Sequence, residues 1–182
     1  LTRIHMEEDA GKSIHDLDPF YSLIDFNRAG VPLLEVVSEP EIRSTEEAYQ
    51  YLYEIRKLVR YINISNGNME EGSLRCDANI SVRPKGSTKL RNRVEVKNIN
   101  SLRHVMKAID LEVNRQIQCY ENNETVNQET RNYNANNNTT TILRTKEDAH
   151  DYRYFPEPDI PPVIISDSLI QEIKSEMPIL PK

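Results

Sequence analysis

An alternating stretch near the middle of the chain constrains the fold more than any other sequence feature. From position 74 to position 82, apolar or small side chains alternate with polar ones without interruption. This period of two is typical of a β-strand with one buried face. The apolar face comprises Leu74, Cys76, Ala78, Ile80 and Val82, and the polar face comprises Arg75, Asp77, Asn79, Ser81 and Arg83. The sequence therefore predicts a strand that presents charged and amide groups opposite a core.

A second alternating stretch, residues 91–98, follows the turn signal PKGS at positions 84–87. Two alternating segments joined by a short polar loop are typical of an antiparallel hairpin. If both segments bury their apolar faces in one core, a single polar surface carries Arg75, Asp77, Asn79, Arg93, Glu95 and Lys97. Such a surface has two interpretations, and the pattern does not choose between them. It is either a salt-bridged exterior of little energetic worth, or a clamp whose cations hold an anion while its carboxylates hold a metal.

Helices are predicted on both sides of this hairpin. Ser44 and Glu47 form a capping box ahead of an apolar stripe that ends before Asn66 and Gly67. Asn100 or Ser101 caps a second helix, whose stripe comprises Leu102, Val105, Met106, Ile109, Val113 and Ile117. A short third helix is expected at residues 168–176. These elements predict an α+β domain in which an antiparallel sheet packs against helices.

The remaining segments give strands and loops. Residues 1–6, 21–26 and 31–38 are expected to form strands. The Asn-rich stretch 121–141 is expected to be a long exposed excursion, because such residues cannot build a core. Four prolines in residues 152–162 favour a rigid, extended segment.

Composition excludes several functional classes. The formal net charge of −6 argues against general binding to nucleic-acid backbones, although one shaped pocket could still recognise an RNA end. No apolar run is long enough to cross a bilayer. Two cysteines give neither a disulfide framework nor a zinc site, and the four histidines lack ligand spacing, so all six are interpreted as structural. The adjacent acids Glu7, Glu8 and Asp9 suit a hard cation such as Mg²⁺, but a solvated turn would look the same.

Several longer motifs carry a family resemblance. They are RIHMEEDAGK (3–12), DFNRAGVPLLE (25–35), SEP (38–40), GNMEEGSLRCDAN (67–79), EVKNINS (95–101), QETR (128–131) and AHDYRYFPEPD (149–159). In this order they resemble the B subunit (GatB) of the aspartyl/glutamyl-tRNA amidotransferases. The resemblance implies a cradle domain related to glutamine synthetase at residues 1–176. Residues 177–182 would begin a linker to a helical domain.

The resemblance also implies an activity. The B subunit of this family uses ATP and Mg²⁺ to phosphorylate the side-chain carboxylate of Glu-tRNA(Gln) or Asp-tRNA(Asn). Ammonia that the A subunit releases from glutamine then displaces the phosphate, while the small C subunit braces the pair. The sequence does not distinguish the Glu route from the Asp route. A cytoplasmic location is implied for a bacterial source, and a mitochondrion or plastid for a eukaryotic one.

Site residues follow from the matched motifs. The resemblance places metal-binding carboxylates at Glu7 and Glu8, with Glu95 as a further candidate. The polar faces of the two predicted strands add further candidates near these carboxylates, namely Arg75, Asp77, Asn79 and Lys97. Catalytic roles are assigned to Glu8, Arg75 and Asp77, and nucleotide binding to Arg75, Asn79, Lys97, Asn27 and Arg28.

The chain also departs from the family pattern. The family's opening segment, which carries a metal-binding His and Glu, is absent from this sequence. The helical and tail domains are absent too, so a fragment is expected. Two rival functions stay open. One is a non-catalytic scaffold or binding module of the same complex, and the other is a different phosphate-activating ligase of this fold.

Overall fold

The computed structural model describes residues 1–145 and 164–179. It divides the chain into two compact units, Leu1–Arg43 and Ser44–Lys182. Together they contain helices and small sheets, which confirms a mixed α+β class. Within the described ranges, no helix has the length and apolar character needed to span a membrane. The predicted extended segment at 152–162 lies outside these ranges.

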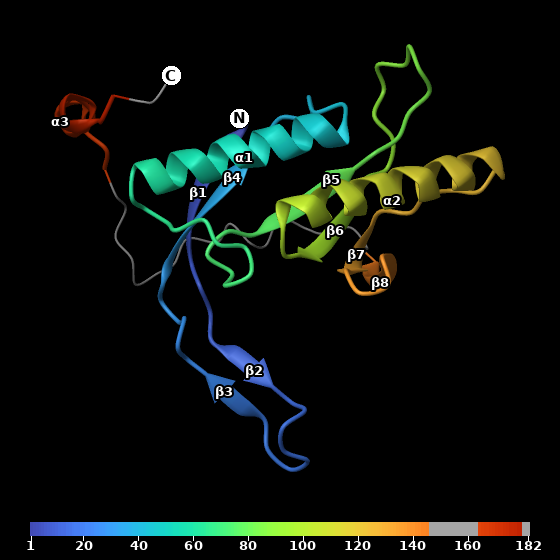
Figure 1. Ribbon diagram of the computed structural model, residues 1–182, viewed down its shortest axis with the longest axis horizontal. Coiled ribbons are helices and arrows are strands. Elements are labelled where there is room, and N and C mark those ends of the chain that lie inside the picture. The colour runs from blue at the N-terminus through green and yellow to red at the C-terminus, as the bar shows by residue number, and fades with distance from the viewer. Residues whose placement is uncertain (146–163, 180–182) are drawn as a thin grey trace. The chain divides into compact units, whose positions relative to one another are not determined.

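The first unit consists of two short antiparallel strand pairs. Strand β1 (Arg3–Glu8) pairs with β4 (Pro32–Val37), and β2 (Lys12–Ile14) pairs with β3 (Leu23–Asp25), as Figure 1 shows. The three strands expected in this region are confirmed, and β2 is an addition. None of residues 1–43 is buried, and Met6 on β1 is 77% exposed.

The second unit contains the helices. Helix α1 spans Thr45–Tyr61, α2 spans Leu102–Glu121 and α3 spans Asp167–Glu176. The predicted caps are confirmed at both long helices. Ser44 Oγ accepts a hydrogen bond from the Glu47 amide, and Ser101 Oγ accepts one from the His104 amide, each at 3.1 Å. These bonds satisfy backbone donors that have no partner within the helix.

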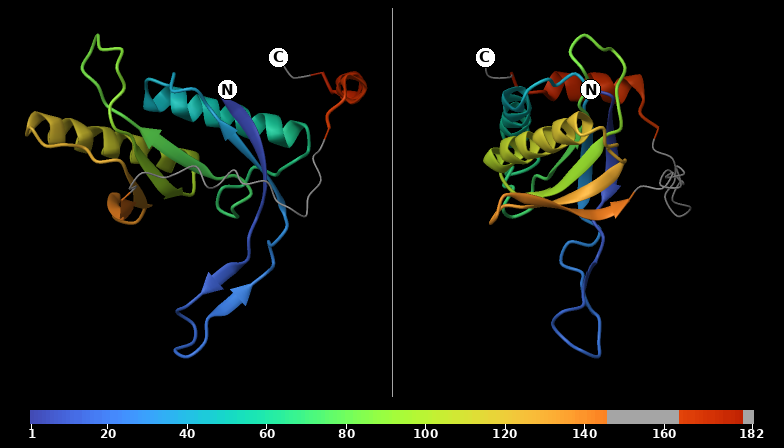
Figure 2. Two further views of the ribbon diagram at one scale, coloured as in Figure 1. Left: turned by 180° about the vertical axis from the view of Figure 1, so that it is seen from behind. Right: turned by 90° about the vertical axis from the view of Figure 1, so that its right-hand side faces the viewer.

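A four-stranded sheet supports these helices. Its order is β5 (Cys76–Ile80), β6 (Val94–Ile99), β7 (Glu129–Asn134) and β8 (Thr139–Thr145). The predicted hairpin is confirmed as antiparallel β5–β6, although both strands are shorter than expected. Helix α2 lies across one face of the sheet with α1 beside it (Figures 1 and 2). The core between helices and sheet contains Ile80, Val94, Val96, Ile99, Val105, Ala108, Val126 and Tyr133.

The sheet is mixed, so the prediction of an antiparallel sheet is wrong for one strand pair. Strand β7 runs parallel to β6, with Glu95 opposite Thr130 and Lys97 opposite Asn132. The reason lies in the connection, because parallel neighbours need a long crossover and α2 provides it. The helix carries the chain back along the sheet before β7 begins.

The expected exposed excursion at 121–141 is also wrong. Thr130 and Tyr133 of β7 are fully buried, and β7 lies between two other strands. The asparagines concentrate in the turn between β7 and β8, where Asn134 Oδ1 accepts from the Asn136 amide and Asn138 has φ +53°. Asparagine tolerates such positive φ values better than most residues. The Asn-rich composition therefore reflects a hairpin turn flanked by packed strands.

The helical stripes are only partly buried. In α1 only Ala48 is buried, and Leu58 is 38% exposed. In α2 the buried positions include Glu112 and Gln116, whereas Ile117 of the predicted stripe is 37% exposed. The prediction of an apolar core face thus fails at Ile117, whereas Val113 packs against the core; the fully buried positions in this half of α2 are polar.

Candidate functional site

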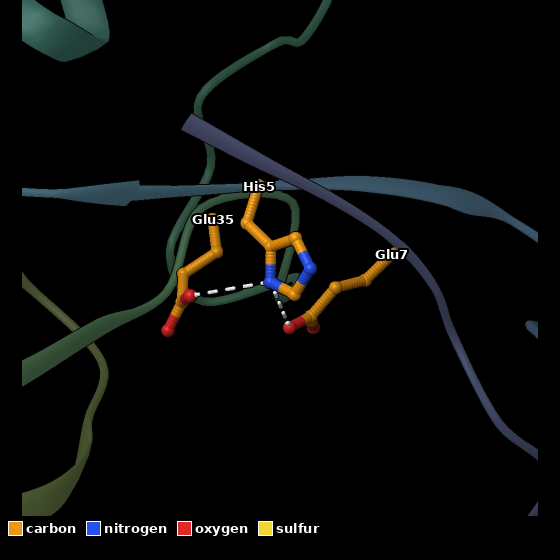
Figure 3. A group of neighbouring side chains, drawn as sticks. All are labelled: His5, Glu7 and Glu35. Atoms are coloured by element: carbon orange, nitrogen blue, oxygen red, sulfur yellow. Dashed lines mark ion pairs between the residues drawn. The ribbon is translucent and has the colours of Figure 1, made fainter. Parts of the chain in front are cut away.

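Three side chains of the β1–β4 pair form a group with metal-ligand geometry. His5 and Glu7 lie two residues apart on β1 and therefore share a face. Glu35 lies opposite His5 in the strand register. His5 Nδ1 is 3.5 Å from Oε1 of Glu7 and 3.7 Å from Oε2 of Glu35 (Figure 3). One donor atom from each residue lies within 4.8 Å of the other two.

The composition of this group decides what it could hold. Two carboxylates offer the oxygen ligands that Mg²⁺ prefers, and their partial exposure leaves room for water or a phosphate oxygen. The imidazole of His5 would suit a transition metal such as Zn²⁺ better than Mg²⁺. The residues therefore fit a divalent cation held mainly by Glu7 and Glu35.

The structure separates the two adjacent glutamates of the sequence motif. Glu7 faces His5 and Glu35, whereas Glu8, the next residue on β1, projects to the opposite face of the strand. The metal and catalytic assignments of Glu8 stay predictions. Sequence reasoning missed His5 and Glu35, although the spacing of His5 and Glu7 on one strand was a usable signal.

Asn27 and Arg28 lie in the turn between β3 and β4. Asn27 donates from its backbone and side-chain amides to Asp25 Oδ1, at 2.9 and 2.6 Å. Arg28 Nε donates to Asp9 Oδ2 at 2.8 Å. Both side chains hold the turn in the described structure, and their predicted nucleotide-binding roles stay predictions.

The polar face of the four-stranded sheet carries a chain of paired groups. We use "polar face" for Asp77 and Asn79 on β5, Glu95 and Lys97 on β6, and Thr130 on β7. Lys97 Nζ pairs with Asp77 Oδ2 and lies 3.7 Å from Glu95 Oε1. Glu95 Oε2 accepts a hydrogen bond from Thr130 Oγ1 at 2.8 Å.

The other predicted members of this surface lie at its margin. Arg75 directly precedes β5 and Arg93 directly precedes β6, and both side chains are exposed. Asn79 is exposed on β5, opposite Glu95 in the register. The structure therefore brings Asp77, Glu95 and Lys97 into contact, with Asn79 beside them.

A second polar network lies on the opposite face, beneath α2, and sequence reasoning did not find it. Arg115 donates to both carboxylate oxygens of Glu112 at 2.8 Å, and Gln116 Nε2 donates to Glu112 Oε1 at 2.7 Å. Arg131 Nη1 donates to Glu129 Oε1 at 2.6 Å. The hydrogen bond to Glu112 raises the pKa of the Arg115 guanidinium, although desolvation opposes the rise. We call Glu112, Arg115, Gln116, Glu129 and Arg131 the buried network.

Gln116 shows that the buried network is structural. Its Nε2 also donates to the Ile80 carbonyl at 3.0 Å, and its Oε1 accepts from the Val82 amide at 3.1 Å. The side chain thereby completes the backbone bonds at the end of β5. The network joins α2 to the sheet and leaves the polar face as the candidate binding surface of this unit.

Comparison with known proteins identifies the family. The model of the GatB/GatE catalytic domain matches residues 1–171, which include the first compact unit and most of the second. The chain belongs to the GatB/GatE catalytic-domain family.

Individual GatB relatives match along the whole chain. They include proteins from Brachyspira hyodysenteriae at 57% identity, Thermodesulfovibrio yellowstonii at 56% and Gluconobacter oxydans at 56%. Each is named as the B subunit of an aspartyl/glutamyl-tRNA(Asn/Gln) amidotransferase. The alignments cover 100% of this chain and 38% of each relative. The sequence thus spans about two fifths of the length of these relatives.

Proposed function

We propose that this chain is part of the catalytic region of an amidotransferase subunit that activates a tRNA-linked carboxylate with ATP and Mg²⁺. The observation that carries the proposal is the His5, Glu7 and Glu35 group, present in a member of the GatB/GatE catalytic-domain family. A glutamine synthetase-like cradle is part of the same proposal. The substrates would be Glu-tRNA(Gln) or Asp-tRNA(Asn), and the activity would be that of a carbon–nitrogen ligase using glutamine as amide donor.

The proposed reaction has two balanced steps. A side-chain carboxylate oxygen attacks the γ-phosphorus of ATP, the bond to the β-phosphate oxygen breaks, and ADP leaves with the electron pair. Ammonia then attacks the acyl carbon, inorganic phosphate departs, and the nitrogen loses a proton as the amide forms. Activation is required because a carboxylate is a poor acceptor for an amine, whereas an acyl phosphate has a good leaving group.

The chain's own residues supply charge for the first step. Glu7 and Glu35 would hold Mg²⁺. Glu8 and Glu95 lie outside this group, and each is proposed as a metal ligand in its own right. Bound Mg²⁺ would neutralise phosphate oxygens and thereby lower the electrostatic barrier to attack. The residues proposed to orient nucleotide phosphates are Arg75, Asn79, Lys97, Asn27 and Arg28. Those proposed to act at the reacting groups are Glu8, Arg75 and Asp77.

One observation favours a scaffold as the second candidate function. Lys97 is already paired with Asp77 and close to Glu95, so the charge of its ammonium is already compensated within the polar face. Surface pairs of this kind occur without any ligand and contribute little. A nucleotide would have to compete with Asp77 for the Lys97 ammonium, and binding measurements can show whether it does.

The test is Mg²⁺-dependent ATP binding and amidation by the full-length protein in its assembled enzyme. Glu7→Gln keeps the shape of the side chain but removes a charge, so the Mg²⁺ concentration for half-maximal ATP binding should rise about tenfold. Glu41→Gln, an exposed change in the same unit, serves as the matched control and should leave that concentration unchanged. Equal Mg²⁺ dependence in wild type and Glu7→Gln would reject the metal assignment and favour the scaffold.

Partners and location follow from the same proposal. The A and C subunits of the amidotransferase would supply ammonia and brace the complex, and misacylated tRNA would be the substrate. The chain's acidic character leaves most tRNA backbone contacts to other parts of the assembly. The location would be cytoplasmic in a bacterium, and mitochondrial or plastid in a eukaryote.

A further inference from the structure

We infer that Thr130 is a positioning residue that fixes the Glu95 carboxylate and, through it, the Lys97 ammonium on the polar face. The part of this inference that concerns ATP rests on the proposed function. The part that concerns Lys97 stands on the geometry of the sheet alone.

The contact runs across three neighbouring strands. Thr130 on β7 lies opposite Glu95 on the parallel strand β6, which places both side chains on one face of the sheet. Thr130 Oγ1 donates to Glu95 Oε2 at 2.8 Å. The other oxygen of the same carboxylate, Oε1, lies 3.7 Å from Lys97 Nζ, and Lys97 in turn pairs with Asp77 on β5. Thr130 and Lys97 therefore contact different oxygens of the Glu95 carboxylate.

Exposure increases along this chain of contacts. Thr130 is fully buried, and the side chain of Glu95 is 14% exposed. The side chains of Lys97 and Asp77 are 34% and 43% exposed. The end at Thr130 is thus held by packing, whereas the end at Asp77 is accessible to a solute. An incoming anion would reach Lys97 and would leave the Thr130–Glu95 bond in place.

The side-chain chemistry explains why a threonine suits this position. A β-branched side chain has few allowed χ1 values, so the Thr130 hydroxyl has a nearly fixed direction. Glutamate has three rotatable bonds and loses orientation readily unless a partner holds its carboxylate. Lysine carries a compact point charge on a flexible stem, and its position depends on the anions around it. The rigid hydroxyl therefore sets the position of two flexible groups.

The consequence concerns binding of phosphate. When a phosphate replaces Asp77 as the partner of Lys97, Glu95 remains the anion that determines where the ammonium lies. Charged groups act on a ligand most effectively when their partners hold them in place beforehand. Without the Thr130 hydroxyl, Glu95 and Lys97 would sample more positions, and Mg²⁺·ATP should bind about tenfold more weakly.

The sheet offers a matched control on its other face. Thr140 on β8 accepts from Arg131 Nε at 2.9 Å through its Oγ1, so it also joins a hydroxyl to a charged group. Its partner Arg131 belongs to the buried network beneath α2 and not to the polar face. Thr140→Val should therefore lower stability without changing Lys97 or nucleotide affinity.

The first measurement does not depend on the nucleotide. In the full-length protein within its assembled enzyme, the rate of Lys97 acetylation by acetic anhydride is followed by mass spectrometry. Thr130→Val should raise this rate several-fold, because a less well-held carboxylate protects the ammonium less. Thr130→Ser keeps the hydroxyl but loses the β-branch, so its rate should return most of the way to the wild-type value, and Thr140→Val should leave the rate unchanged. If valine is not tolerated, the pair Thr130→Ser and Thr130→Ala carries the same comparison.

The second measurement is the dissociation constant of Mg²⁺·ATP for the same variants. A tenfold increase in Thr130→Val with recovery in Thr130→Ser supports the full inference. Changed Lys97 labelling in an enzyme whose wild type binds no nucleotide would reject the proposed function and keep the positioning role. Unchanged labelling in Thr130→Val, or equal effects of Thr130→Val and Thr140→Val, would overturn the positioning role.

Discussion

The two faces of the four-stranded sheet carry the same kinds of charged side chain in different surroundings. Beneath α2, the side chain of Glu112 is fully buried and those of Glu129 and Arg131 are 7% and 11% exposed. On the polar face, Lys97 and Asp77 are about one third and two fifths exposed. Both faces pair carboxylates with cations, so composition alone does not separate them.

Burial decides whether an ion pair can stabilise the fold or exchange one member for a ligand. A buried charge has given up its hydration, so losing its partner leaves a large uncompensated cost. An exposed pair exchanges partners with water at little cost, and a ligand can take the place of one member. The buried network is therefore suited to joining α2 to the sheet, and the polar face is suited to binding.

The largest expected effect comes from breaking the buried network. Glu112→Ala removes the carboxylate that accepts hydrogen bonds from Arg115 and Gln116. The unfolding free energy of the full-length protein should therefore fall by about 3 to 5 kcal/mol. Chemical denaturation measures this change. Asp110→Ala, an exposed change on the same helix, should cost less than about 0.5 kcal/mol. A loss in Glu112→Ala as small as in this control would contradict the comparison.

A smaller effect is expected at Cys76, which points toward the core beside Asp77 of the polar face. Burial raises the pKa of the Cys76 thiol from 9.0 to about 12, and the Asp77 carboxylate adds to the rise. The neutral thiol is favoured in the folded state. Its stability contribution is complete below the unfolded pKa and is lost as pH rises from about 9 toward 12.

The measurement for Cys76 is the change in unfolding free energy between pH 9 and pH 10. Wild type should lose about 1 kcal/mol more than Cys76→Ala over this interval, since other titrating groups are common to both proteins. Parallel pH profiles of the two proteins would contradict the expectation. Iodoacetamide at pH 8 should also modify Cys76 slowly in the native protein and rapidly in denaturant.

The smallest stability effect is expected on the polar face. Asp77→Asn breaks the exposed pair with Lys97 and should change the unfolding free energy by less than about 1 kcal/mol. Amidation by the assembled enzyme should nevertheless fall at least tenfold, because the proposed function assigns Asp77 to the reacting groups. Glu54→Gln breaks a similarly exposed pair with Lys57 on α1 and should affect neither quantity measurably. A large loss of stability in Asp77→Asn would remove the distinction between the two faces.

Much of the local structure could be predicted because its causes are local. The caps at Ser44 and Ser101 and the β5–β6 hairpin depend on residues close together in the sequence, and all are confirmed. The position of β7 beside β6 depends instead on α2, which connects these two parallel strands across a long stretch of the chain. The Asn-rich composition concealed this strand because two of its three buried residues, Glu129 and Thr130, are polar and only Tyr133 is hydrophobic.

For the candidate site, the sequence likewise indicated individual residues but not the contacts between them. The family resemblance indicated Glu7 and Glu95, and the predicted strand faces indicated Asp77 and Lys97. Which groups pair with them depended on strand register, which placed Glu35 opposite His5 and Thr130 opposite Glu95. Register is a long-range property, because it aligns residues that the chain separates by a whole element.

Sequence alone predicts the family, the α+β class and the residue types of a charged strand face, since neighbouring residues carry the motifs and the periodicity. The folded structure was needed to show that Glu112 and Glu129 are buried and that Lys97 lies between Asp77 and Glu95. The physical reason is that the energetic meaning of a charge depends on its surroundings. Folding sets those surroundings by bringing distant strands and a helix together.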